Sequence, residues 1–158
     1  MEGWYLKTVR IALYQPEIPQ NTGTLLRLGA CLNVGLDIIE PCGFVFSDQR
    51  LQRSGMDYIQ ECDYRRHPSW VDFYQNCKTR LILLTPAAQT PYYDFAFQSD
   101  DTLLLGRESD GVPSDVATLC PYHLQIPMIP RRRSINIAIA ASMVLGEALR
   151  QIKGFPHA

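Results

Sequence analysis

The stretch YHLQIPMIPRRRSIN, residues 122–136, joins a strand-like run to an apolar, alanine-rich helix that we expect to extend to about residue 151. Three consecutive arginines at 131–133 stand immediately before a Ser-Ile-Asn helix start. The free N–H groups and the dipole of a helix N-terminus favour negative charge, so this junction is suited to an anionic ligand. The alternative is that Ser134 is only an N-cap and the arginines only a solvated loop.

Strand-like and helix-like segments alternate along the whole chain. Alternating or continuous apolar runs predict strands at 8–14, 35–40, 80–85, 102–105 and 122–126. Cap residues and apolar spacing predict helices at 21–32, 69–77, 114–119 and 134–151. This alternation predicts an α/β fold, with a mostly parallel sheet flanked by helices. Ligands of such folds bind at the carboxyl ends of the strands.

Composition indicates one ordinary globular domain over residues 1–158. The net charge of −1 is not that of a typical nucleic-acid-binding protein, although three local basic clusters (Arg50 with Arg53, residues 65–67 and residues 131–133) leave a basic face open. Five widely spread cysteines without a C-x-x-C pair favour reduced thiols in the cytosol over disulfides or zinc. We find no signal peptide, no membrane span and no His/Cys spacing typical of a metal site.

Upstream, the segment PEIPQNTGTLLRL at 16–28 is the first of two further motifs. We expect Asn21 to cap a helix that carries Arg27 between two leucines. A guanidinium among apolar neighbours needs an anionic partner, which could be a ligand or an ordinary structural carboxylate. The side chain could also extend along the surface to reach water.

The other upstream motif is LGRESDGVP at 105–113, where two glycines flank the carboxylate of Glu108 at a strand end. Gly106 would let backbone approach a ligand closely, or the segment could simply be a turn. Neither a G-x-G-x-x-G fingerprint nor a P-loop is present, which disfavours dinucleotide and nucleoside triphosphate sites. No nucleophile–base pair has a recognisable context, and His67, His123 and His157 are isolated.

Taken in order, the motifs N-x-G-x-x-x-R at 21–27, G-x-E-x-x-G-V-P at 106–113 and R-S-I-N at 133–136 resemble those of the SPOUT-class RNA 2′-O-ribose methyltransferases (the SpoU/TrmH superfamily). Segments 14–23 and 50–58 are similar to those of the subfamily that methylates the wobble nucleotide of tRNA, the TrmL type. The resemblance covers about residues 9–150. Arg107, Asp110 and Ile135 depart from the usual pattern, outside the positions that would be catalytic.

The resemblance implies an α/β-knot fold with a C-terminal trefoil knot over about residues 81–151. It also implies a homodimer and S-adenosylmethionine (AdoMet) as cofactor, without a metal. The positions that would bind the cofactor are Leu84, Thr85, Gly106, Ile126, Ser134 and Ile135.

The implied reaction is 2′-O-methylation of the wobble cytidine or modified uridine in a tRNA anticodon loop. Arg27 would act as the base or stabilise the developing alkoxide, and an arginine normally keeps its proton. The remaining catalytic positions would be Asn21, Glu108 and Asn136, and the RNA-binding positions Arg50, Arg53, Arg131 and Arg132. Two alternatives stay open: a SPOUT enzyme acting on rRNA, and a non-catalytic RNA-binding relative.

Overall fold

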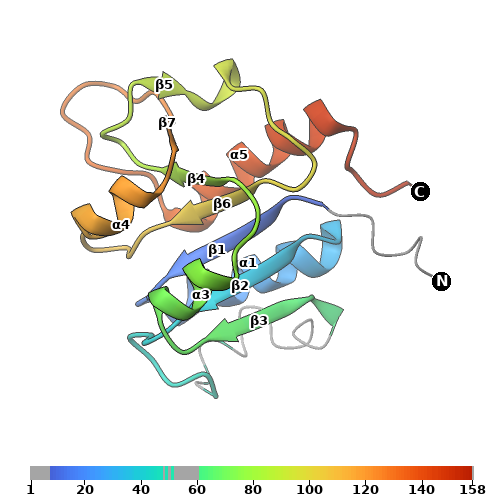
Figure 1. Ribbon diagram of the computed structural model, residues 1–158, viewed down its shortest axis with the longest axis vertical. Coiled ribbons are helices and arrows are strands. Elements are labelled where there is room, and N and C mark those ends of the chain that lie inside the picture. Colours follow the sequence, from blue (N-terminus) through green and yellow to red (C-terminus); the bar gives the residue numbers. More distant parts are fainter. Residues whose placement is uncertain (1–7, 48, 50, 52–60, 158) are drawn as a thin grey trace.

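The computed structural model describes residues 8–47, 49, 51 and 61–157. Within these residues the chain forms one sheet with the strand order β3-β2-β1-β6-β4-β7-β5 (Figure 1). Every pairing between these strands is parallel. The strands are β1 (Arg10–Tyr14), β2 (Gly35–Ile39), β3 (Tyr64–His67), β4 (Leu81–Leu84), β5 (Thr90–Pro91), β6 (Thr102–Leu105) and β7 (Tyr122–Gln125).

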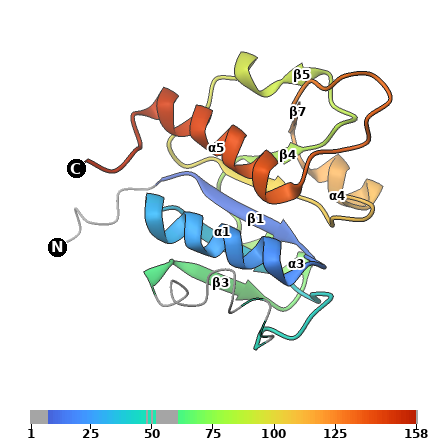
Figure 2. The ribbon, with the colours of Figure 1, turned by 180° about the vertical axis from the view of Figure 1, so that it is seen from behind.

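Helices cover both faces of this sheet. They are α1 (Pro19–Leu32), α3 (Trp70–Asn76), α4 (Ser114–Leu119), α5 (Ile137–Ile152) and the short 3-10 turn η3 (Tyr92–Asp94). Helices α1 and α5 lie next to each other on one face, as the view from behind shows (Figure 2). Phe73 of α3 and Val116 of α4 pack on the opposite face, in a second and smaller apolar cluster.

Burial explains why the central strands are mostly apolar and do not alternate between polar and apolar residues. All residues of β2 and β6 are buried, and β1 lies between these two strands. A parallel strand covered by helices on both faces exposes neither side, so alternation of polar and apolar residues disappears. The packing therefore confirms the predicted α/β class with a mostly parallel sheet.

Most predicted elements are confirmed to within about two residues, but the N-caps of two helices differ from the prediction. Helix α1 begins at Pro19 with Ile18 as its N-cap, so the prediction that Asn21 caps this helix is wrong. Helix α5 is capped by Asn136, whose side chain accepts hydrogen bonds from the backbone N–H groups of Ala138 and Ile139. The alternative in which Ser134 is the N-cap is therefore wrong as well.

Two strands escaped the sequence analysis, and each has a physical reason. Strand β3 lies at one edge of the sheet, where Arg65 and Arg66 are exposed, so it lacks the apolar run that marks a buried strand. Strand β5, at the other edge, has only two residues. The trefoil knot over about residues 81–151 stays a prediction. None of the helices in the described part of the chain is long and apolar enough to cross a membrane.

Candidate active site

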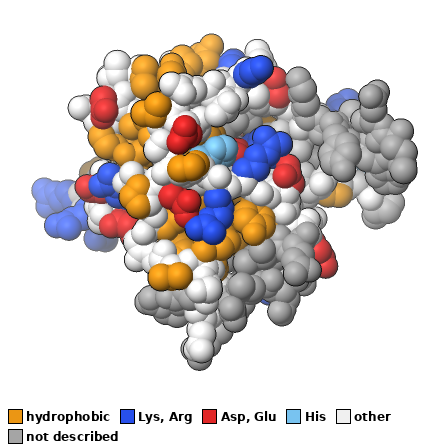
Figure 3. All heavy atoms as spheres, turned by 60° about the horizontal axis from the view of Figure 1, so that its bottom comes forward, with side chains coloured by type: hydrophobic (Ala, Val, Ile, Leu, Met, Phe, Trp, Pro, Cys, Tyr) orange, Lys and Arg blue, Asp and Glu red, His pale blue; other side chains and the backbone are white. Residues whose placement is uncertain are grey.

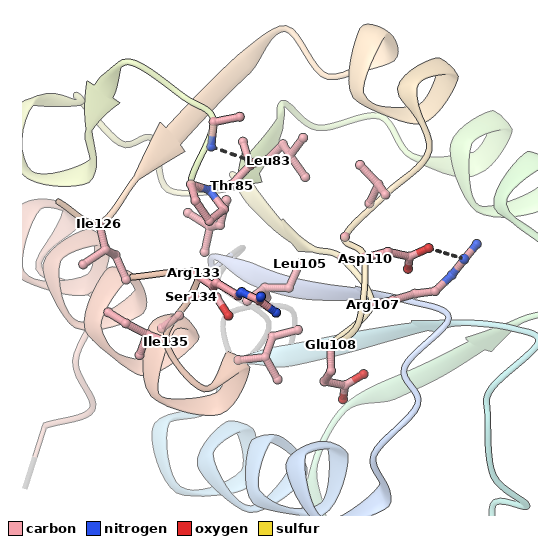
Figure 4. A pocket seen from close by; sticks show the side chains of 18 of the residues that line it. Leu83, Thr85, Leu105, Arg107, Glu108, Asp110, Ile126, Arg133, Ser134 and Ile135 are labelled. Atoms are coloured by element: carbon pink, nitrogen blue, oxygen red, sulfur yellow. Dashed lines mark hydrogen bonds and ion pairs between the residues drawn. The ribbon is translucent and has the colours of Figure 1, made fainter. Parts of the chain in front are cut away.

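A cavity of about 810 Å³ opens at the carboxyl ends of β4, β6 and β7. This size is within the usual range for sites that bind small molecules and cofactors. Its wall combines the segments after these strands with the start of α5 (Figure 4). The position agrees with the expectation that ligands of a parallel α/β sheet bind where its strands end.

The six positions expected to bind a cofactor all line this cavity: Leu84, Thr85, Gly106, Ile126, Ser134 and Ile135. Ile126, Ser134 and Ile135 lie on one side, opposite the loop that carries Glu108 (Figure 4). Leu83, Leu105 and Leu124 add buried apolar surface. Such a mixture of aliphatic walls and a few hydroxyl and backbone groups suits a ligand with an aromatic ring and polar substituents.

Gly106 is essential to the shape of the loop after β6. A Cβ atom at this position would lie 2.5 Å from the backbone of Gly111, closer than real contacts allow. Arg107 and Gly111 exchange two backbone hydrogen bonds of 2.9 and 3.0 Å, which fold the loop back on itself. A bulkier residue at 106 would therefore displace the loop itself, in addition to narrowing the cavity.

Three expected catalytic residues form one hydrogen-bonded chain at the cavity wall. Asn136 donates from Nδ2 to Oδ1 of Asn21 at 3.1 Å, and Asn21 donates from Nδ2 to Oε1 of Glu108 at 3.4 Å. These residues come from all three sequence motifs, and all three line the cavity. The chain of contacts links the start of α5, the first turn of α1 and the loop after β6.

Glu108 supplies the cap that α1 lacks. The helix has no side-chain cap from its own N-cap residue and no acidic residue in its first turn. The Glu108 carboxylate instead accepts the N–H groups of Glu17 at 2.8 Å and of Ile18 at 3.2 Å. The carboxylate thus satisfies the N–H of the N-cap residue and of the residue before it, and a negative charge at this end is favoured by the helix dipole.

Arg107 and Asp110, which depart from the usual motif, form a pair with each other. Arg107 Nη1 lies 3.4 Å from Asp110 Oδ2, and the guanidinium stands 5.3 Å from the ring centre of Tyr14. The pair points away from Ile126 and Ser134 (Figure 4). Both residues also line the cavity, so their ion pair links two positions of the loop after β6 at the cavity edge.

The basic residues expected to act on RNA are exposed where the structure describes them. Arg27 is exposed on α1, which agrees with the alternative that its side chain reaches water, and its catalytic role stays a prediction. Arg131, Arg132 and Arg133 are all exposed, and Arg133 also lines the cavity. Arg50 and Arg53 lie outside the described residues. On the face in Figure 3, basic and acidic side chains are interspersed rather than separated.

The other titratable groups give little sign of catalytic chemistry. Burial is the main cause that raises the pKa of the Cys42, Cys62 and Cys120 thiols to about 11 in each case. His123 lines the cavity, but its Nε2 contacts the backbone carbonyls of Ala117 and Cys120. In the described ranges, no three His, Cys, Asp or Glu side chains are grouped closely enough to hold a metal ion.

The parallel sheet and the cavity built from three RNA-methylase motifs define a class of methyltransferase. The chain matches the SpoU rRNA Methylase family over residues 8–146 and belongs to this family. A protein of Beijerinckia indica named tRNA (cytidine(34)-2′-O)-methyltransferase is 52% identical over 145 residues, which cover 90% of this chain and 91% of that protein. The protein of that name from Escherichia coli K12 is 39% identical, with 95% and 97% covered.

Solved structures agree with this assignment. A structure described as giving insights into the 2-OH methylation of C/U34 on tRNA superposes with a TM-score of 0.89 at 37% identity, covering 94% of this chain and 98% of that one. A SpoU methyltransferase from Streptomyces viridochromogenes, solved in complex with AdoMet, superposes with a TM-score of 0.79 at 27% identity. That comparison covers 92% of this chain and 60% of the other. The resemblance to SpoU-class enzymes is therefore confirmed over nearly the whole chain.

Two residues of the site region were missed by the sequence analysis as contacts. Glu17 accepts hydrogen bonds from Ser109, and Ser109 lines the cavity. Both residues stand inside the quoted motifs, but no spacing rule pairs positions 92 residues apart. The only available signal was position, because Ser109 follows Glu108 and Glu17 stands four residues before Asn21.

Proposed function

We propose that this protein transfers a methyl group from AdoMet to the ribose 2′-hydroxyl of the wobble nucleotide in a tRNA anticodon loop. The observation that carries the proposal is the cavity at the strand ends, where Asn21, Glu108 and Asn136 form one chain of hydrogen bonds. Relatives matched over nine tenths of the chain are named for methylation of cytidine 34, which supports the nucleotide position.

The cavity suits AdoMet in size and in the chemistry of its wall. Leu84, Ile126 and Ile135 would enclose the adenine, and Thr85 and Ser134 offer hydroxyl groups for the polar parts. The narrow turn at Gly106 brings backbone to the cavity edge. When bound, AdoMet supplies an electrophilic methyl group. No metal is required in this scheme.

The protein's own residues would orient the acceptor and manage its charge. A ribose hydroxyl is a weak nucleophile, so a positioned group must take its proton or stabilise the alkoxide that develops. Arg27 is exposed on α1, six residues beyond Asn21, where an RNA phosphate and ribose could reach it. Asn21 and Asn136 would orient the hydroxyl, and the hydrogen bond between them holds the starts of α1 and α5 together.

The RNA partner would contact the basic segment before α5. Arg131 and Arg132 are exposed there, beside Arg133 at the cavity. Arginines position a nucleic acid mainly through its phosphates. An anticodon loop presents unstacked bases and an accessible ribose, whereas an RNA stem keeps its base edges in a deep, narrow major groove. Arg50 and Arg53 are proposed as additional phosphate contacts.

A homodimer would complete the RNA-binding surface. The outer face of α5 exposes Ile139 and Met143, which are 55% and 39% accessible, and Ile18 at the start of α1 is 41% accessible. Apolar side chains one helical turn apart, on a helix that adjoins α1, fit a two-fold contact between identical surfaces. Sedimentation velocity at micromolar concentration should give the mass of two chains, and a stable monomer would contradict this part of the proposal.

The proposal is tested by mass spectrometry of nucleosides and of nuclease fragments after reaction of the purified protein with labelled AdoMet and bulk tRNA. Label should appear as a 2′-O-methylated cytidine or uridine at the wobble position. Since the family description names rRNA, ribosomal RNA should be included as a competing substrate. Label only in rRNA would favour the second candidate, and label on a base would overturn the reaction type. We also propose that the enzyme works in the cytoplasm, where tRNA is available.

A further inference from the structure

Two loops from distant parts of the chain hold each other by a reciprocal exchange of hydrogen bonds. Glu108 accepts the N–H groups of Glu17 and Ile18, as described above. In return, Oε1 of Glu17 accepts the N–H of Ser109 at 3.0 Å and its hydroxyl at 2.8 Å. Each carboxylate is thus bound by the loop that carries the other. We call this set of four bonds the loop clasp.

The loop clasp joins the two parts of the molecule that must meet during methyl transfer. On one side, the loop after β6 carries Gly106 and Ser109 at the proposed cofactor cavity. On the other side, residues 15–18 lead directly into α1, which carries Asn21 and Arg27. A third segment supports the second side, because Gly43 donates its N–H to the carbonyl of Pro16 at 2.9 Å.

We propose that Glu17 and Ser109 are positioning residues that set the distance and angle between the methyl donor and the ribose hydroxyl. This inference rests on the proposed function and adds to it two residues that do not themselves react. Glu17 does not line the cavity; it acts through Ser109, which does. Displacements of about 1 Å in such an arrangement can slow a reaction about 100-fold, so modest bonds can have a large kinetic effect.

Charge favours a positioning role for Glu17 over a simple structural ion pair. Within residues 8–47, 49, 51 and 61–157, the recorded partners of Oε1 are the N–H and O–H of Ser109, and no ion pair with Glu17 is recorded there. Those contacts are directional, so they fix the loop geometry more narrowly than a charge pair would. The Ser109 hydroxyl can also donate to Asp110, at 3.2 Å. The Ser109 backbone N–H, in contrast, donates to Glu17.

The experiment compares Glu17→Ala, Ser109→Ala, the double variant and Glu17→Gln with the parent protein. The rate of a single turnover is measured with saturating AdoMet and tRNA, and the affinity for S-adenosylhomocysteine by calorimetry. We expect Glu17→Ala to slow methyl transfer about 10-fold or more, with a smaller change in affinity. Glu17→Gln should recover most of the rate, because its amide oxygen can still accept both bonds.

A matched control exists on α3, away from the cavity. There Ser69 donates its hydroxyl to Asp72 and accepts the N–H of Asp72, a serine–carboxylate contact of the same kind. Asp72→Ala should leave the single-turnover rate within about twofold of the parent, because surface changes of this kind have small effects. Hydrogen exchange should rise in the peptide over 105–112 in Glu17→Ala and stay unchanged there in Asp72→Ala.

Two results would overturn the inference. One is a Glu17→Ala variant with the parent's single-turnover rate. The other is a double variant whose loss equals the product of the single losses, because residues that share one contact are not additive. If the parent itself methylates no tRNA, the proposed function fails; the exchange measurement then still reports whether the loop clasp exists.

Discussion

Replacing Glu108 by alanine removes the only side-chain cap that the structure records for α1. The change deletes two hydrogen bonds to backbone N–H groups, at 2.8 and 3.2 Å, and one of 3.4 Å to Asn21. Loss of a helix cap usually costs about 0.5–2 kcal/mol. One of the two shorter bonds is partly buried and the other is exposed, so about 1 kcal/mol for each is a fair measure. The long third bond adds little.

The free energy of unfolding of Glu108→Ala should therefore fall by about 2 kcal/mol. For a chain of this length, 1 kcal/mol lowers Tm by about 2–4 °C, so Tm should fall by about 4–8 °C. Glu108→Gln keeps one oxygen but turns an amide donor toward a backbone N–H, and it should lose about half as much. Urea unfolding followed by circular dichroism measures the free energy, and calorimetry measures Tm.

Asp110→Ala is the matched control in the same loop. Its carboxylate is exposed and pairs with Arg107 at 3.4 Å. Exposed ion pairs of this kind contribute about 0–1 kcal/mol. Equal losses in the Asp110 and Glu108 variants, or an unchanged Tm in Glu108→Ala, would refute the reasoning that Glu108 caps α1 across the two loops.

Arg27→Ala should reduce the single-turnover rate by about 10²–10⁴-fold while the calorimetric affinity for S-adenosylhomocysteine stays nearly constant, and near-normal turnover would remove the catalytic role. Replacing Arg131 and Arg132 by alanine should weaken tRNA binding and lower the slope of log affinity against log salt by about 2; an unchanged slope would show that phosphates bind elsewhere. Thiol alkylation at pH 8 should be much slower in the native than in the denatured protein, because a pKa of about 11 leaves little thiolate. Because the pKa of these thiols is higher in the folded than in the unfolded protein, they contribute stability that is complete below pH 9 and is lost as the pH rises toward 11. The urea midpoint should therefore fall between pH 9 and 11. A constant midpoint would show that the thiols titrate normally in the native protein. The thiols in question are Cys42, Cys62 and Cys120.

The class of fold and the order of the main elements were predictable from local pattern. Continuous apolar runs such as 102–105 mark strands that are covered on both faces, and the spacing of apolar residues marks one face of α5. Strand β3 was not predictable in this way. As an edge strand it buries little, and its arginines face solvent.

The ordered motifs were sufficient to indicate the class of enzyme and most of the site. Residues such as Gly106 and Ser134 stand next to the chain features that place them, a strand end and a helix start, so they line the cavity as expected. Local reasoning failed where a contact replaced a local cap. Asn21 reads as an N-cap, yet α1 starts at Pro19, and Glu108 accepts the N–H groups of the two residues before it, Glu17 and Ile18.

The sequence by itself therefore determined the alternation of strands and helices, the parallel sheet and the three motifs that carry the chemistry, because each depends on neighbouring residues. Only the tertiary structure decided which motif residues touch. Asn136 donates to Asn21, 115 residues away, and Ser109 donates to Glu17, 92 residues away. Such contacts depend on the strand order and on loop geometry. Both are set by packing of the whole sheet, which no local pattern encodes.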